Sequence, residues 1–321
     1  MTRVRACIIA GASLYCSFPL SFLIFKYRIG VVLNKREKVG FMLLKIPEKT
    51  INQYPETEKK LLSDNLQLQE QLVQALEQVA LSEKEKSLID KRFVSDGFFP
   101  YYTQQKIKIL FLGKESLGLG GLDYVDIVIK PIKTNDPRER GSSWSNNKDP
   151  FWSKILYITY GLNNGFCDYK EMPWASDIGL HGFAIEGGIS FAFMNFSKFD
   201  NPGEYYSADY KTMSKYCEMV ERTGRNWHED QIDLLNPDVI ISMNIAGYLL
   251  RMFKIDSWRS LFDTDSNSHG IPYVDIGYLP VKSRKIPLIN TWHFSAPGKE
   301  FNKCYYVPIV RSMKECFKLQ P

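Results

Sequence analysis

The segment Ile107-Lys108-Ile109-Leu110-Phe111-Leu112-Gly113-Lys114-Glu115-Ser116 is a largely apolar run that leads into a glycine, a lysine and a carboxylate. Short continuous apolar runs are typical of strands covered on both faces of a sheet. A second such run, residues 286–289, leads into Thr291-Trp292-His293-Phe294-Ser295-Ala296-Pro297-Gly298-Lys299. Open α/β sheets bind ligands at the carboxyl ends of their strands. The two stretches together predict a site where a carboxylate faces an imidazole.

Other short apolar runs alternate with helical patterns from about residue 98 onward. The predicted strands are 107–112, Tyr124–Ile129, 189–194, 239–243, 273–276 and 287–289. The predicted helices are 150–160, 207–221, 229–235, 245–253 and 300–318. This alternation indicates βαβ crossovers. We expect an α/β three-layer sandwich with a central, mostly parallel sheet, preceded by a helical N-terminal extension.

Residues 42–97 are expected to form the helical extension, and residues 98–321 the α/β domain. Residues 56–92 are strongly helical in composition, with leucines at mixed three-, four- and seven-residue steps. The favoured interpretation is a helix or helical pair that packs on the main domain. The alternative is a short coiled coil for self-association, with Gln69 as a polar core position.

Residues 1–41 form an apolar and basic leader. Residues 7–25 contain no charged side chain, while arginines and lysines flank the run on both sides. The favoured interpretation is that this leader precedes the native start, with Met42 as that start. The alternatives are a membrane anchor through 7–25 and a buried or disordered segment.

The composition of the 321-residue chain is that of an ordinary globular protein, with a net charge of +5. That charge permits a nucleic-acid partner without requiring one. The six cysteines contain no C-x-x-C pair, and the four histidines have no metal-ligand spacing, so we expect no metal site. The scattered cysteines do not indicate a set of disulfide bonds, and this favours a reducing, cytoplasmic location.

Three polar residues at strand ends are candidates for chemistry. The glycine-rich loop 113–121 fits neither G-x-G-x-x-G nor the P-loop, so it is either a tight turn or a loop that presents Glu115. Asn195 ends an apolar strand. It is either a turn residue or a side chain whose amide forms hydrogen bonds with the edge of a pyrimidine. His293 is either a hydrogen-bonded core histidine or a catalytic one.

These strand ends resemble the uracil-DNA glycosylase superfamily over roughly residues 98–319. The family's first motif reads G-Q-D-P-Y-H, and this chain reads Gly113-Lys114-Glu115-Ser116-Leu117-Gly118. The family's G-L-x-F corresponds to Gly121-Leu122-Asp123-Tyr124, and its strand-end asparagine to Met194-Asn195. Its last motif, H-P-S-P, is matched more loosely by His293-Phe294-Ser295-Ala296-Pro297.

The resemblance implies excision of uracil or a related damaged base from DNA, with no metal or organic cofactor. Glu115 would activate water and His293 would stabilise the departing base. Tyr124, Asn195 and Leu117 would contact that base. The DNA backbone would be met by the loop residues Ser295, Ala296, Pro297, Gly298 and Lys299. The basic residues Lys282, Arg284, Lys285 and Lys299 either form a solvated basic surface or add attraction that does not depend on sequence.

Several motif positions differ from the family, and these differences keep a second function open. Ser116 and Phe294 replace prolines, Leu117 replaces a tyrosine, and Glu115 replaces an aspartate. The alternative is therefore a catalytically weak or inactive module that binds nucleic acid or a nucleotide.

Overall fold

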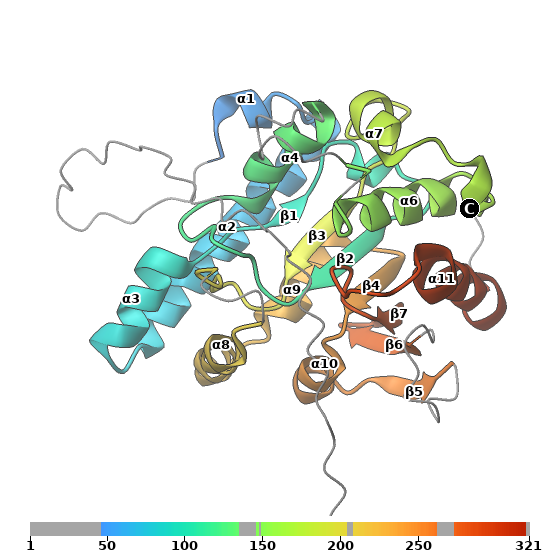
Figure 1. Cartoon of the computed structure of the whole chain (residues 1–321). Coiled ribbons are helices and arrows are strands. Elements are labelled where there is room, and N and C mark those ends of the chain that lie inside the picture. The colour runs from blue at the N-terminus through green and yellow to red at the C-terminus, as the bar shows by residue number, and fades with distance from the viewer. Residues whose placement is uncertain (1–45, 135–145, 148, 204–207, 262–272, 319–321) are drawn as a thin grey trace, which may run out of the picture. The chain divides into compact units, whose positions relative to one another are not determined.

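A seven-stranded sheet runs through the computed structural model, which describes residues 46–134, 146–147, 149–203, 208–261 and 273–318 (Figure 1). The strands are β1 (Gly97–Phe98), β2 (Ile109–Gly113), β3 (Ala192–Asn195), β4 (Val239–Met243), β5 (Asp256–Ser260), β6 (Val274–Val281) and β7 (Arg284–Thr291). Their order is β1-β3-β2-β4-β7-β6-β5. The central strands β3, β2, β4 and β7 pair in parallel, and antiparallel strands flank them on both sides. The expected α/β class and the parallel centre of the sheet are confirmed.

Three of the four central strands are buried along their whole length, which explains their continuous apolar character. Every residue of β2, β3 and β4 is buried. Two predicted strands belong to a longer hairpin: 273–276 covers the beginning of β6, and 287–289 lies in the middle of β7. β1 and β5 were not predicted, because β1 has two residues and β5 is largely exposed.

Helices account for most of the remaining described residues. They are α1 (Glu48–Ile51), α2 (Glu56–Val79), α3 (Glu83–Arg92), α4 (Tyr124–Thr134), α6 (Trp152–Asn163), α7 (Ala175–Asp177), α8 (Tyr210–Arg222), α9 (Trp227–Leu235), α10 (Ala246–Met252) and α11 (Val307–Arg311). π-Helical turns cover Ile178–Gly182, Asn302–Tyr306 and Ser312–Cys316. The five predicted helices are all confirmed, the last of them as α11 with its two flanking π-helical turns.

The predicted strand Tyr124–Ile129 is wrong, because this segment begins helix α4. The Asp123 carboxylate accepts a hydrogen bond of 2.9 Å from the Asp126 amide, as a helix cap does. The buried positions recur at helical spacing. They are Tyr124, Val125, Val128, Ile129, Pro131 and Ile132. A short apolar run is typical both of a buried strand and of a buried helix, so the periodicity of the sequence alone does not distinguish a strand from a helix here.

The helical pair predicted within residues 56–92 is present as α2 and α3. α3 begins after Ser82, whose hydroxyl accepts the Glu85 amide at 3.3 Å. One face of α2 is buried against the rest of the chain, including α8 and α9. Gln69, considered above as a coiled-coil core position, is hydrogen-bonded to Asp96. The described residues between 46 and 318 form one compact unit that contains both the helices and the sheet.

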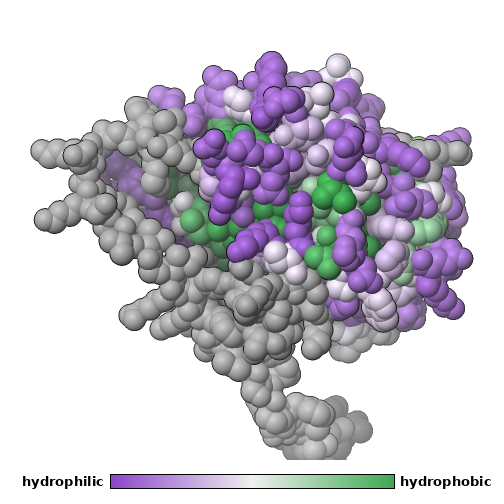
Figure 2. Space-filling model, turned by 90° about the horizontal axis from the view of Figure 1, so that it is seen from above, coloured by the Kyte–Doolittle hydropathy of each residue, from purple (hydrophilic) through white to green (hydrophobic). Residues whose placement is uncertain are grey.

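Some apolar side chains remain on the surface. Figure 2 shows hydrophobic patches between hydrophilic areas on the face seen from above. Trp174 is 69% exposed and Leu81 is 79% exposed. No helix within the described ranges is both long and apolar enough to cross a membrane. Segment 7–25, considered above as an anchor, lies outside these ranges.

Candidate active site

Three of the predicted site residues lie at or just beyond the carboxyl ends of parallel strands. Asn195 ends β3 and pairs with Gly113 at the end of β2. Glu115 follows β2, and His293 follows β7. Because these strands are parallel, their ends share one border of the sheet, here named the carboxyl edge. In the sheet, β3 lies on one side of β2 and β4 lies on the other, so the direction of strand addition reverses at β2. Open α/β sheets bind ligands at such reversals.

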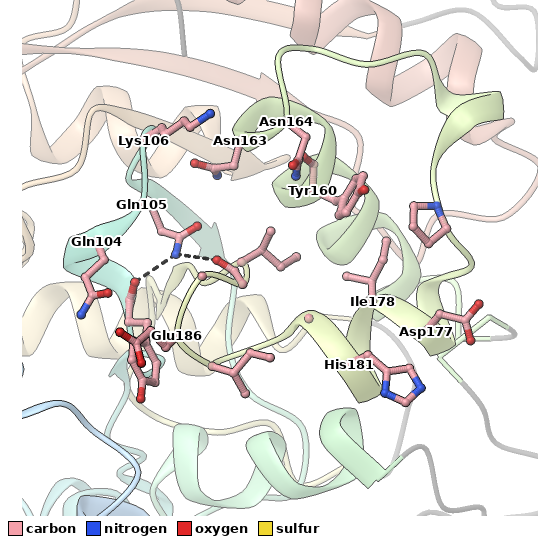
Figure 3. Close-up of a pocket in the computed structure, with 17 residues that line it drawn as sticks. Gln104, Gln105, Lys106, Tyr160, Asn163, Asn164, Asp177, Ile178, His181 and Glu186 are labelled. Atoms are coloured by element: carbon pink, nitrogen blue, oxygen red, sulfur yellow. Dashed lines mark hydrogen bonds between the residues drawn. The ribbon is translucent and has the colours of Figure 1, made fainter.

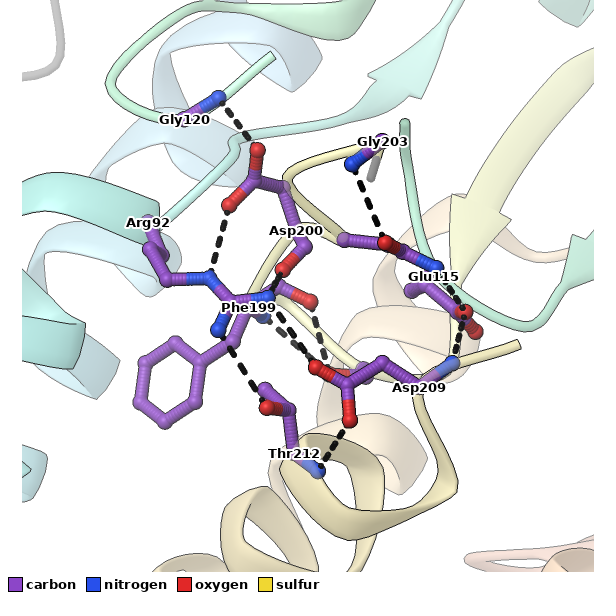
Figure 4. A network of polar contacts seen from close by, with 10 residues as sticks. Arg92, Glu115, Gly120, Phe199, Asp200, Gly203, Asp209 and Thr212 are labelled. Atoms are coloured by element: carbon purple, nitrogen blue, oxygen red, sulfur yellow. Dashed lines mark hydrogen bonds and ion pairs between the residues drawn. The ribbon is translucent and has the colours of Figure 1, made fainter. Parts of the chain in front are cut away.

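Glu115 uses one carboxylate oxygen for structure. Oε1 accepts the Asp209 amide hydrogen at 2.9 Å and the Asn201 side-chain amide at 3.4 Å (Figure 4). Oε2 is buried and has no hydrogen-bond partner among the described residues, and neither has the neighbouring Ser116 hydroxyl. Burial raises the pKa of the Glu115 carboxyl above its usual value, while the Asp209 amide works against that rise.

Asn195 is buried and presents an unused amide donor. Its backbone N–H donates to Asp96 Oδ2 at 2.7 Å, but its side-chain Nδ2 has no partner within the described residues. A Cβ on Gly113 would lie 3.2 Å from Asn195 Oδ1 and 3.0 Å from Phe193 Cζ. Glycine at 113 therefore leaves the space into which the amide and the ring fit. Buried polar groups without partners are uncommon in native proteins, and here a ligand would satisfy one.

A buried polar network holds the end of β3. Asp96 Oδ1 accepts Lys198 Nζ at 2.6 Å and Gln231 Nε2 at 3.0 Å. The Asp96 carbonyl accepts the side-chain amides of Asn65 and Gln69, both from α2, at 2.8 and 2.7 Å. Both ends of the Lys198–Asp96 pair are fully buried. The N-terminal helix α2 therefore contributes directly to the surroundings of Asn195.

His293 is held as a neutral ring with a defined tautomer. Its Nδ1 accepts the Ser295 amide hydrogen at 3.2 Å, which places the ring proton on Nε2. Its carbonyl accepts the Ala296 amide at 2.8 Å and the Tyr305 hydroxyl at 3.1 Å. Burial lowers the pKa of His293 to about 4, and the nearby Lys114 adds to that shift. The Nε2–H group is therefore a neutral hydrogen-bond donor at physiological pH.

Lys154, which the sequence did not single out, anchors the histidine loop. It lies on α6 and is 6% exposed. Its Nζ donates to the carbonyls of Pro150 and Phe294. Burial lowers the pKa of Lys154 to about 8. The ammonium thus ties the start of α6 to the residue that follows His293, and it disfavours protonation of that imidazole.

An aromatic cluster connects Asn195's strand with His293. Tyr124, the predicted base-stacking ring, already stacks on Phe193, with ring centres 4.6 Å apart and planes 15° apart. Phe151 is half-buried, and its ring lies 6.0 Å from that of Phe193 and 5.8 Å from that of His293. Phe151 was missed because it precedes a helix and belongs to no strand-end pattern. Leu117, predicted to contact the base, is 50% exposed.

The loop after His293 uses two of its amides internally. The Ser295 and Ala296 amides bond to His293, so two of the donors predicted to meet DNA phosphates are already engaged. Pro297 and Gly298 are exposed, and Gly298 adopts a φ of 67°. Lys299 Nζ lies 4.3 Å from the centre of the Trp292 ring.

The other basic residues predicted to help bind DNA lie at the opposite end of β7. Lys282, Arg284 and Lys285 belong to the β6–β7 turn, and an eight-residue strand spans about 27 Å. They pair with Asp230 at 2.6 Å, Asp233 at 3.5 Å and Asp256 at 2.7 Å. They therefore do not contribute to the carboxyl edge. No cluster of possible metal ligands occurs among the described residues.

A cavity of about 780 Å³ lies away from these residues (Figure 3). It is lined by residues that precede β2 and β3 and by the turn Ile178–Gly182. Within it, Gln105 Nε2 donates to the carbonyls of Tyr101 and Gly188 at 3.0 and 3.2 Å. Asn163 is likewise bonded to the backbone of Ile107. These amides are already paired, and the cavity lies at the edge opposite to the unpaired groups of Glu115 and Asn195.

Comparison of the chain with protein-family models, with curated proteins and with solved structures finds no match.

Proposed function

We propose that this chain hydrolyses the N-glycosidic bond of uracil or a related damaged base in DNA. One observation supports this most strongly. Glu115 Oε2 and Asn195 Nδ2, which follow neighbouring strand ends, are both buried without a partner among the described residues. A neutral imidazole donor follows β7 at the same edge. A nucleobase and a water molecule would satisfy these groups together.

Glu115 is suited to act on the water. Its raised pKa makes the ionised carboxylate a stronger base, and one oxygen stays free for a new hydrogen bond. Cleavage of the glycosidic bond leaves positive charge on the sugar, which an adjacent carboxylate stabilises. The base departs with the bonding electron pair, and water then attacks the anomeric carbon and gives its proton to the Glu115 carboxylate.

His293 and Asn195 are suited to the base. Negative charge collects on a base oxygen as the bond breaks, and a preorganised N–H donor stabilises that charge without reorganisation. The Nε2–H of His293 would serve in this way. Asn195 offers both a donor and an acceptor, which match the edge of a pyrimidine. Such recognition requires the base to leave the helical stack, and Phe151 would then contact its face.

The proposal includes a three-layer arrangement with helices on both faces of the sheet, DNA as the partner and a cytoplasmic location. Lys299 and Lys114 are the cations at the carboxyl edge that would attract phosphates. Lys114 Nζ lies 5.0 Å from the Tyr210 ring, so both lysines sit beside aromatic side chains.

The test is incubation with oligonucleotides that each contain one uracil, hypoxanthine or oxidised pyrimidine, single- or double-stranded, followed by alkaline cleavage. Glu115→Gln should slow excision by orders of magnitude and leave oligonucleotide affinity unchanged. The matched control is Glu171→Gln, at an exposed carboxylate remote from the edge. Equal excision by wild type and Glu115→Gln would remove Glu115 from the reaction.

A second candidate function is a module that binds nucleic acid without cutting it. The observation that favours it is the structural use of Glu115 Oε1, which holds Asp209 and Asn201. Tight binding to the same oligonucleotides with no alkali-labile product would support this alternative and contradict hydrolysis.

A further inference from the structure

Arg92, the last residue of α3, is surrounded by acceptors from a distant part of the chain. Its Nε lies 3.1 Å from Asp200 Oδ1, and its Nη1 lies 3.3 Å from Thr212 Oγ1. Its Nη2 donates to the Asp200 carbonyl and lies 3.4 Å from Asp209 Oδ2 (Figure 4). The Arg92 side chain is 20% exposed and that of Asp200 is 6% exposed. Partly buried pairs of this kind are screened less by salt than surface pairs.

One residue that Arg92 holds, Asp209, and the neighbour of another, Asp200, also hold Glu115. The Asp209 amide donates to Glu115 Oε1, while Asn201, which follows Asp200, reaches the same oxygen. The Asn201 amide also donates to the Ser116 carbonyl at 2.8 Å. One guanidinium therefore holds Asp209, whose amide contacts Glu115, and Asp200, which directly precedes Asn201.

Two further bonds show how this arrangement is braced. Asp200 Oδ2 accepts the Gly120 amide at 3.0 Å, which ties the glycine-rich loop to the same centre. Asp209 Oδ1 accepts the Thr212 amide at 3.0 Å and so caps α8. The Asp209 carboxylate is shared between the helix and Arg92, which limits the movement of its backbone amide.

We propose that Arg92 is a positioning residue for Glu115: by holding Asp209, it keeps that amide on Oε1 and leaves Oε2 for the reacting water. This inference rests on the proposed function for its kinetic consequence. It makes the N-terminal helix α3 part of the active site, although Arg92 itself touches no reacting atom. The ionisable groups that act on Glu115 are Lys114 on its own loop, Asp209 before α8, and Tyr248 on α10.

The first test follows the Glu115 carboxyl carbon by NMR during a pH titration, with Glu115→Gln used to assign the signal. In Arg92→Met, loss of the Asp209 hydrogen bond should raise the Glu115 pKa. The control is Arg251→Met, which removes an exposed bidentate pair with Glu221 and should leave that pKa unchanged. An unchanged Glu115 titration in folded Arg92→Met would overturn the inference.

The second test is a double-mutant cycle on single-turnover excision. Arg92→Met should slow excision roughly ten- to hundred-fold, as expected for loss of a hydrogen bond to a charged group. It should cause no further slowing in the Glu115→Gln background, and oligonucleotide affinity should not change. A purely structural role predicts equal slowing in both backgrounds and would refute the positioning role.

Two provisions keep the outcomes distinct. If Arg92→Met does not fold, Asp209→Asn keeps a capping side chain and removes the carboxylate that faces Arg92, and it should give the same two results. If wild type excises no base but the Glu115 titration depends on Arg92, the proposed reaction fails while the positioning role stands. If excision occurs but the titration is independent of Arg92, only the positioning role fails.

Discussion

The protonation state of His293 is the prediction that tests the site most directly. The proposed role needs a neutral ring with its proton on Nε2. The pKa of about 4, against 6.5 for an ordinary histidine, is a difference of roughly 2.5 units. At about 1.4 kcal/mol per pKa unit, the surroundings favour the neutral ring by about 3.5 kcal/mol.

The assay is a long-range ¹H–¹⁵N correlation experiment on protein labelled at histidine, recorded between pH 7.5 and pH 3.5. His293→Gln identifies the signal. We expect a neutral Nε2–H tautomer at pH 7 and a titration midpoint near 4. In Lys114→Met, removal of a nearby ammonium should raise the midpoint, but not to 6.5, because burial is the larger cause. His228 should keep its own midpoint and serves as the internal control.

Two results would refute this reasoning. A midpoint near 6.5 in the wild type would mean that the ring is solvated and charged in mild acid. A proton on Nδ1 would mean that the Ser295 amide does not hold the ring as described. In the proposed mechanism, loss of excision in acid should follow protonation of Glu115, whose pKa is raised, and not titration of His293.

Three further predictions concern the contact of Phe151 with a base, the space beside Gly113, and the stability of the fold in acid. Phe151→Leu should weaken affinity for a flipped base by about 1–3 kcal/mol, measured by competition binding, while an unmodified oligonucleotide should bind as before. Gly113→Ala should cost about 1–3 kcal/mol of unfolding free energy by urea titration and slow excision, because the new methyl group crowds Asn195. Burial lowers the pKa of His228 to about 4, so the unfolded chain binds more protons between pH 6.5 and pH 4. Stability should therefore fall by about 3 kcal/mol as pH drops through that window, and His228→Gln should reduce this loss.

The parts of the site that the sequence predicted are those with local signals. Glu115, Asn195 and His293 each follow a continuous apolar run, and such runs are buried strands whose ends lie at a sheet edge. Tyr124 was assigned to a strand, because its apolar neighbours do not distinguish a short strand from the face of a helix.

The parts that the sequence did not predict depend on distant contacts. Arg92 and Asp200 are 108 positions apart, and Lys154 is 140 positions from Phe294. Neither Arg92 nor Lys154 belongs to a recognisable sequence pattern, since an arginine or lysine on a helix usually faces solvent. The basic residues of the β6–β7 turn were predicted to attract DNA, but they form ion pairs with acidic residues on α9 and β5. Their spacing along the chain gave no indication of these partners.

The buried Lys198–Asp96 pair has a consequence for anyone who shortens this chain. A fragment that starts at residue 98 would keep the ammonium and delete its counter-charge, together with the α2 side chains that surround Asp96. Leaving one member of a buried pair alone costs about 3–5 kcal/mol, a large share of the stability of a typical domain. We therefore expect expression trials that trim the chain to residues 98–321 to yield insoluble material, and cloning boundaries belong upstream of α2.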